Sequence, residues 1–120
     1  MKILYKGNID HPDETRKFSA HGYAEVVSLG DFTLGRGTFE PGWKWSNDVK
    51  PIAGTESCQV RHSGIILSGH MTIRADDGTE LGYGPGDVFL VEPGHDAWVD
   101  GEDPCISLDA GLAPYAKPEE

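Results

Sequence analysis

Three residues in the middle of the chain, Glu56, Cys58 and His62, carry side chains that bind transition metals. Imidazole and thiolate groups are common ligands of zinc, iron and copper. The three positions have the same parity, so on one extended strand their side chains would face the same side. Positions four apart on a straight strand are separated by about 13 Å, so a shared metal requires a bend between Gln59 and Arg61. Alternatively, Cys58 is a small buried hydrophobic residue and His62 a hydrogen-bonded histidine of the interior.

Two further histidines are candidates for chemistry. His95 follows the turn signal Pro93-Gly94 and could be a metal ligand or a general acid or base, because its ordinary pKa lies near neutrality. The alternative is a turn histidine that pairs with Asp96 or with a backbone carbonyl. His70 follows Gly69 at the start of a predicted strand and is a candidate pocket residue.

Aromatic and cationic side chains provide candidate binding groups. Trp43 and Trp45 share one face of a predicted strand, and Trp98 follows later in the chain. They could form the wall of a small-molecule site, or they could serve core or dimer packing. Arg36 could bind a carboxylate, with an ordinary surface arginine as the alternative.

Several catalytic motifs are absent from the sequence. It contains no G-x-G-x-x-G, no P-loop and no G-x-S-x-G nucleophile elbow. Cys58 and His62 could act as nucleophile and base, but the sequence marks neither an orienting third group nor oxyanion donors.

Composition limits the possible partners and locations. The net charge of −10 disfavours binding to nucleic acid or to an anionic membrane surface, because both would be repelled. No apolar run approaches the roughly 18 residues of a membrane span, and the N-terminus lacks an apolar stretch of signal-peptide length. Two cysteines are too few for a disulfide scaffold. We therefore predict a cytoplasmic protein with reduced thiols.

The elements that must position these residues are short strands. The 120 residues include 16 glycines and 8 prolines, so chain reversals must be frequent. About ten apolar or alternating runs predict the strands of a sandwich or closed barrel, at residues 23–29, 31–39, 43–49, 57–62, 64–67, 71–74, 80–83, 87–91, 97–99 and 105–108. Residues 71–81 predict a hairpin with a two-residue type I′ turn at Asp77-Gly78. Residues 12–18 predict one helical turn, and residues 113–120 a loosely ordered tail.

The second half of the chain carries an ordered set of motifs. Residues 64–69 (GIILSG) precede the predicted hairpin, and residues 84–95 (GPGDVFLVEPGH) follow it. This order resembles the cupin superfamily, in which a strand ending V-L-x-G, a hairpin and P-G-D-x-x-x-x-P-P-G succeed one another. The resemblance implies an all-β double-stranded β-helix barrel and a single domain over residues 1–120. Its core would span about residues 32–110, with an N-terminal arm at 1–22, a C-terminal tail at 111–120 and a buried strand at 88–91.

The resemblance also implies a set of metal-ligand positions. Cupins usually supply His-x-His and Glu from the first motif and a further His from the second. Counting back from the glycine at position 69 places His62 at the Glu position and Glu56 and Cys58 in the His-x-His stretch. The second-motif position falls on Ala97, which cannot bind a metal, and His95 lies two residues earlier with the same parity.

A different alignment of the first motif, counted forward from Gly42, places Asp48 at the first ligand position, and the sequence leaves this register open. The resemblance therefore predicts a small-molecule-binding cupin whose metal site is divergent or absent. If a divalent metal is present, zinc, iron or nickel is expected. The alternative function is a metal-dependent oxygenase or isomerase acting on a small polar organic substrate. The predicted assembly is a homodimer in which N-terminal segments pack across the partner.

Overall fold

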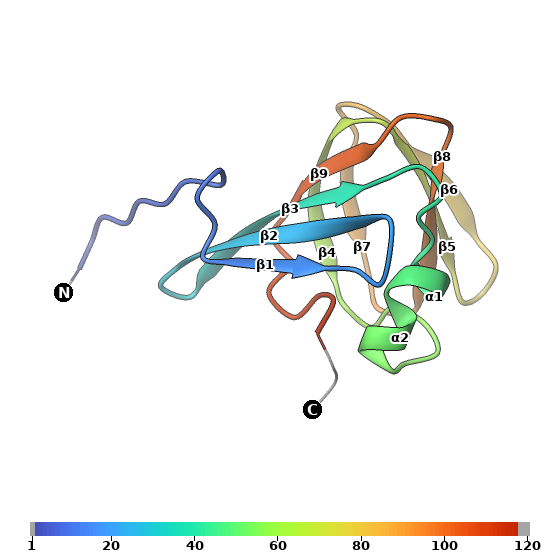
Figure 1. Cartoon of the computed structure of the whole chain (residues 1–120), viewed down its shortest axis with the longest axis horizontal. Helices are drawn as coiled ribbons and strands as arrows, with labels where there is room; N and C mark the ends of the chain where they lie inside the picture. Colours follow the sequence, from blue (N-terminus) through green and yellow to red (C-terminus); the bar gives the residue numbers. More distant parts are fainter. Residues whose placement is uncertain (1, 118–120) are drawn as a thin grey trace.

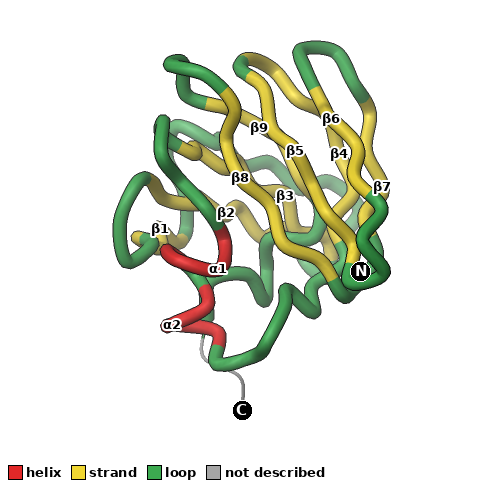
Figure 2. Tube along the Cα trace, turned by 90° about the vertical axis from the view of Figure 1, so that its right-hand side faces the viewer, coloured by secondary structure: helices red, strands yellow, loops and turns green. Residues whose placement is uncertain are grey.

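Two antiparallel sheets enclose the interior of the protein, as the computed structural model of residues 2–117 shows (Figures 1 and 2). The larger sheet has six strands in the order β1-β2-β3-β9-β4-β7, and the smaller has three in the order β6-β5-β8. The strands within these residues are β1 (Glu14–Lys17), β2 (Gly22–Leu29), β3 (Phe32–Phe39), β4 (His62–Ser68), β5 (His70–Ala75), β6 (Glu80–Tyr83), β7 (Val88–Val91), β8 (His95–Asp100) and β9 (Cys105–Asp109). The all-β prediction is confirmed.

Alternation along the strands defines the interior. In β8 and β9 every second side chain points inward, beginning with His95 in β8 and with Cys105 in β9. The core between the sheets is rich in aromatic rings, and Phe39 packs edge-on against Trp43 with ring centroids 4.5 Å apart. Each such ring, once buried, contributes about 1.5–3 kcal/mol of hydrophobic stabilisation.

The predicted strand at residues 43–49 is wrong. This segment forms a short helix, α1 (Trp45–Asp48), followed by α2 (Lys50–Ala53). The Asp48 side chain accepts a hydrogen bond from the Lys44 backbone N–H at 3.0 Å, which satisfies a donor at the start of α1. The two helices lie together at one end of the strands (Figure 2). Neither helix that the structure describes has the length or apolar character needed to cross a membrane.

The predicted helical turn at residues 12–18 is also wrong. Residues 14–17 form β1, which pairs with β2 over the register Glu14↔Val26 to Lys17↔Tyr23. The local helix signal of Pro-Asp-Glu is overridden because pairing with β2 satisfies the backbone groups of β1 that face that strand.

The hairpin at residues 71–81 is confirmed, but its turn is not type I′. The Ala75 N–H donates to the Thr79 carbonyl at 2.8 Å and closes a three-residue loop. Gly78 has φ +93°, whereas Asp77 is not among the non-glycine residues of positive φ, and a type I′ turn requires positive φ at both central positions.

The tail is packed as far as the structure describes it. Leu112 and Tyr115 are buried, and Arg16 donates from Nη1 to both of their carbonyl oxygens, at 2.8 and 2.7 Å. The prediction of a loose tail is therefore wrong for residues 113–117, because buried side chains and a buried arginine anchor them. Residues 118–120 of the predicted tail lie outside the described residues.

Candidate metal centre

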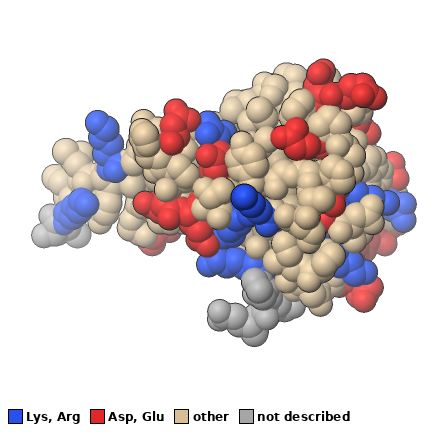
Figure 3. All heavy atoms as spheres, in the orientation of Figure 1, with Lys and Arg blue, Asp and Glu red and all other residues tan. Residues whose placement is uncertain are grey.

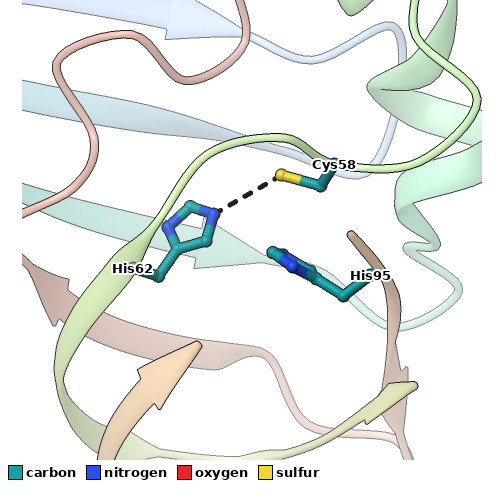
Figure 4. Close-up of side chains that lie close together, drawn as sticks. All are labelled: Cys58, His62 and His95. Carbon is teal, nitrogen blue, oxygen red and sulfur yellow. Dashed lines mark hydrogen bonds between the residues drawn. The ribbon is translucent and has the colours of Figure 1, made fainter. Parts of the chain in front are cut away.

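Three side chains converge inside the barrel: Cys58, His62 and His95 (Figure 4). All three are buried, and each offers one ligand atom within 4.8 Å of the others. Cys58 Sγ lies 3.6 Å from His62 Nε2. The sequence-based count from Gly69 landed on His62 and Cys58, together with Glu56, whereas the count from Gly94 landed on Ala97, two residues after His95.

A short isolated bridge holds the two motifs together. The Cys58 N–H donates to the His95 carbonyl at 2.8 Å, and the Gly94 N–H donates to the Cys58 carbonyl at 2.7 Å. Between Cys58 and His62 the chain belongs to no strand, so the predicted strand at residues 57–62 is wrong. This irregular stretch supplies the bend that a shared metal requires, because a straight strand would hold the two side chains too far apart.

Both imidazoles use Nδ1 to donate away from the cluster. His62 Nδ1 donates to Asp109 Oδ2 at 2.6 Å, and His95 Nδ1 donates to the Glu92 carbonyl at 2.8 Å. Each ring therefore keeps its Nε2 as the remaining ligand atom. A histidine that binds a metal through one nitrogen almost always donates from the other to a carboxylate or a carbonyl. The cluster has this pattern twice.

Asp109 is placed by the close approach of β4 and β9. Gly64 of β4 lies opposite Asp109, and a Cβ at this glycine would collide with the Leu108 carbonyl oxygen. Asp109 Oδ1 accepts hydrogen bonds from the Ser63 and Gly111 N–H groups at 3.1 and 2.7 Å. Both carboxylate oxygens are thus engaged, which holds the carboxylate rigidly against His62.

The cluster shifts the pKa values of its members. Burial alone raises the pKa of the Cys58 thiol, but hydrogen bonds from His62 and then His95 outweigh it and lower the pKa to about 6. Burial alone lowers the pKa of His62, but hydrogen bonds to Asp109 and Cys58 raise it to about 9. Without a metal, the two groups favour a thiolate–imidazolium pair.

The separation of Cys58 Sγ from His62 Nε2 fits a tetrahedral metal ion. Zinc lies about 2.3 Å from sulfur and about 2.0–2.1 Å from nitrogen, so tetrahedral ligands of these two kinds are about 3.6 Å apart. Cys58 Sγ and His62 Nε2 have this separation already. Three protein ligands leave one coordination position for another molecule.

A small cavity of about 50 Å³ lies beside the two histidines. Its walls are largely apolar and include Phe39, Ile66, Met71, Ile73, Phe89 and Val91. Trp43, Trp45 and Tyr115 also line it, and the Tyr115 ring lies edge-on to His62 with centroids 5.0 Å apart. Two of the three predicted tryptophans therefore do reach the cavity, although they do so from a loop and a helix.

Other candidates from the first motif lie outside the cluster. The Glu56 side chain is 98% exposed and lies 3.2 Å from the Lys50 Nζ. Asp48 is buried, but its carboxylate accepts a hydrogen bond from the Lys44 N–H and lies 3.1 Å from His21 Nδ1. These two partners engage the carboxylate at the start of α1. The structure thus favours the register that places Cys58 and His62 together.

The remaining candidates lie on outer faces. Trp98 points outward from β8 and packs against the Lys44 Nζ, 5.5 Å from its ring centroid. Arg36 binds carboxylates of its own chain, Glu25 and Asp10, each at 3.0 Å. His70 is exposed and borders a separate surface hollow.

Sequence reasoning missed Asp109 and Tyr115. Asp109 had a detectable signal, because it continues the inward alternation of Cys105 and Ser107 along β9 and is therefore a carboxylate at a core position. Tyr115 had none, because it lies in a Pro-containing tail without periodicity.

Comparison with known proteins places the fold. No family model matches the chain, and no curated protein matches it. Among solved structures, a protein of unknown function from Rhizobium leguminosarum is 21% identical, with 99% of this chain and 100% of that chain covered and a TM-score of 0.63. A Klebsiella pneumoniae protein with a double-stranded β-helix domain is 19% identical over 96% and 97% of the two chains, with a TM-score of 0.59. A cupin-superfamily sugar phosphate isomerase from Silicibacter pomeroyi is 19% identical over 87% and 73%, also with a TM-score of 0.59.

The chain has the cupin fold. This confirms the resemblance found in the sequence. Within this fold, Ala97 faces the interior at the second-motif position, and His95 lies two residues earlier on the same face of β8. The imidazole on this face of β8 therefore comes from position 95, whereas position 97 holds an alanine, which offers no ligand atom.

Proposed function

We propose that this cupin binds one divalent metal ion through Cys58 Sγ and the Nε2 atoms of His62 and His95, and that it holds a small organic ligand at the open coordination position. The observation that carries the proposal is the pair of Nδ1–H donations, to Asp109 and to the Glu92 carbonyl. They leave two buried Nε2 atoms beside a buried thiol, a donor set that suits a metal.

Zinc is the first choice of metal. One thiolate and two imidazoles form a borderline-soft donor set of the kind that zinc accepts in open sites. Iron and nickel are the alternatives that the same donors can bind.

The residues of the chain have separable roles in this proposal. Asp109 holds His62 in the tautomer that presents Nε2, and the Glu92 carbonyl does the same for His95. Tyr115 and Trp45 cover the cluster and limit the entry of water. When bound, the metal would polarise an oxygen atom of the ligand.

A metal-dependent enzyme, of oxygenase or isomerase type, is the second candidate function. The observation that favours it is the number of protein ligands, because structural zinc sites are closed by four and catalytic sites keep a position open.

Elemental analysis of protein purified without a metal-affinity tag tests the metal centre. We expect about one zinc, iron or nickel per chain, with an X-ray absorption edge that identifies the metal. A protein that stays metal-free after dialysis against zinc would contradict the proposal. Turnover then separates the two candidate functions, because a binding protein returns its ligand unchanged.

We also propose that the protein is a homodimer, as the sequence suggested. The N-terminal segment extends away from the body in Figure 1, and its Ile3 and Leu4 are exposed. Residues 88–91 form the edge strand β7, and the prediction of a buried strand is wrong for Val88 and Leu90, which face outward. Acidic and basic side chains are interspersed over the face in Figure 3. A second copy of the chain would cover both apolar features, because each lacks a partner within residues 2–117. Light scattering at tens of micromolar should give the dimer mass, and a monomer mass would refute this.

A cytoplasmic location stays a prediction, supported by the two free thiols.

A further inference from the structure

We propose that the ligand of the cavity is a carbonyl or carboxylate compound of about two or three carbons, without a phosphate group, whose oxygen accepts a hydrogen bond from Trp43 Nε1. This inference rests on the metal centre proposed above and specifies what shares the cavity with it.

The indole N–H of Trp43 lacks a partner. Trp43 is 2% exposed, and within residues 2–117 its Nε1 is the buried side-chain polar atom that makes no hydrogen bond. A buried donor without an acceptor is unfavourable, and native proteins rarely leave one. Trp43 lines the same cavity as His62 and His95, and it also borders a polar hollow beside Trp98. We assign the missing acceptor to an oxygen of a ligand in the first of these, where the two imidazoles lie.

The size of the cavity limits the ligand. The cavity volume is about 50 Å³, and one water needs about 10–15 Å³. The space is therefore sufficient for about three to five waters, or for an organic molecule of about four or five non-hydrogen atoms. Sugars and aromatic acids exceed this limit unless the walls move.

The charges around the cavity exclude a phosphate. No lysine or arginine is among the described residues that line it. Its one carboxylate, Asp109, already accepts hydrogen bonds from His62 and from two backbone N–H groups. A divalent metal beside one thiolate and one carboxylate gives a centre of no net charge, so a dianion would be desolvated without compensation. The chemistry thus differs from what a sugar phosphate would require.

The walls suit the remainder of a short alkyl compound. Ile66, Met71, Ile73 and Phe89 offer only apolar contacts. A ligand with one polar end toward the metal and Trp43, and a short alkyl body, matches this distribution.

Calorimetry on the zinc-loaded full chain tests size and charge without any substitution. The probes are acetohydroxamate, benzohydroxamate and inorganic phosphate. We expect acetohydroxamate to bind, benzohydroxamate to bind at least tenfold more weakly and phosphate not to bind. Equal or tighter binding of phosphate or of benzohydroxamate would overturn the inference. A chain that holds no zinc at the outset would instead refute the proposed function itself, and with it this inference.

The substitution Trp43→Phe tests the hydrogen bond, because it keeps an aromatic ring and removes the N–H. Acetohydroxamate should lose about 3- to 10-fold in affinity, the usual effect of one neutral hydrogen bond. Ethanethiol, which reaches the metal through sulfur and offers no oxygen, should bind both forms equally. Trp98→Phe on the outer face is the matched control. Zinc stoichiometry and circular dichroism establish that each variant is folded. Equal affinity of acetohydroxamate for wild type and Trp43→Phe would overturn the assignment of Trp43. If Trp43→Phe does not fold, the size and charge series decides the inference.

Discussion

Cys58 and Cys105 are both free and buried, 2% and 0% exposed, yet the barrel gives them opposite chemistry. Burial, followed by the charge of Asp100, raises the pKa of Cys105 to about 11. Cys58 has a pKa of about 6, because two imidazoles outweigh the same burial effect. Burial therefore does not decide whether a cysteine is inert, since the neighbouring donors determine the charge of the sulfur.

The two cysteines also differ in the backbone that carries them. Cys105 lies in the regular ladder of β9, paired with Phe39 of β3. Cys58 lies in an irregular loop that touches β8 through one isolated bridge. A ladder spaces side chains regularly, whereas the loop lets Cys58 turn back toward His62. The predictions below test this contrast.

The largest effect is expected from His62→Ala. The variant removes one imidazole ligand and also leaves Asp109 Oδ2 without its hydrogen-bond donor, so metal binding should be abolished. Cys58→Ser should cause a severe loss as well, whereas Cys105→Ser should retain one metal per chain. Elemental analysis after dialysis is the measurement. Full metal occupancy in folded His62→Ala would contradict the proposed contrast between the two cysteines, because the metal would then be bound at another site.

The next effect is on the charge of Cys58 in the metal-free protein. Its pKa of about 6 lies below the ordinary value of 9.0, so the thiolate should form as pH rises through 6 and be present at neutral pH. In His62→Ala the largest lowering interaction is lost, so the pKa should rise and the thiolate signal at neutral pH should disappear. Ultraviolet absorbance of the thiolate reports both, with Cys58→Ser as the blank. A titration midpoint unchanged by His62→Ala would show that His95 alone sets the charge.

His95→Ala should weaken metal binding without abolishing it. The pair of Cys58 and His62 remains, and its distance already matches a tetrahedral ion. We expect a loss on the order of 100-fold, about 2.7 kcal/mol, measured by competition with a chelator. His70→Ala, outside the cluster on β5, is the matched control and should leave the affinity unchanged.

The fold and part of the candidate site could be predicted from the sequence, but the geometry of the site could not. The glycine-punctuated motifs indicated the barrel, and counting from Gly69 found His62 and Cys58 because turns fix the register of the strands between them. Counting from Gly94 landed on Ala97, and His95 was a candidate only because it shares the parity of that position. Glu56 satisfied the same parity argument, yet its side chain lies in solvent because the loop before Cys58 is not extended. The partner Asp109, 47 residues from His62 in sequence, required knowledge that β9 lies beside β4.

Asp109→Asn should have a smaller effect on the metal than loss of a ligand. The asparagine side chain still fills the space, but its amide oxygen accepts the hydrogen bond from His62 Nδ1 less strongly than a carboxylate does. The substitution also removes a negative charge. Partners of this kind are worth about 10- to 100-fold in metal affinity. Chelator competition measures the loss. Asp100→Asn, beside Cys105, is the comparison and should leave metal affinity intact while lowering the pKa of Cys105. Equal metal affinities of Asp109→Asn and wild type would mean that His62 needs no partner to hold its tautomer.

The smallest effect is expected from Cys105→Ala. Cys105 is fully buried at the start of β9, and its side chain makes no hydrogen bond to a residue of the metal centre. Its contribution to stability is therefore packing alone. Removing one sulfur atom from a core position should cost about 1 kcal/mol of the free energy of unfolding. Metal affinity should be unchanged, because β9 keeps its ladder with β3 and β4 and thereby the position of Asp109. Denaturant unfolding of the metal-free protein measures the first quantity, and chelator competition the second. A large loss of metal affinity with an intact barrel would show that the two cysteines are coupled through β9, and would end their description as independent regions.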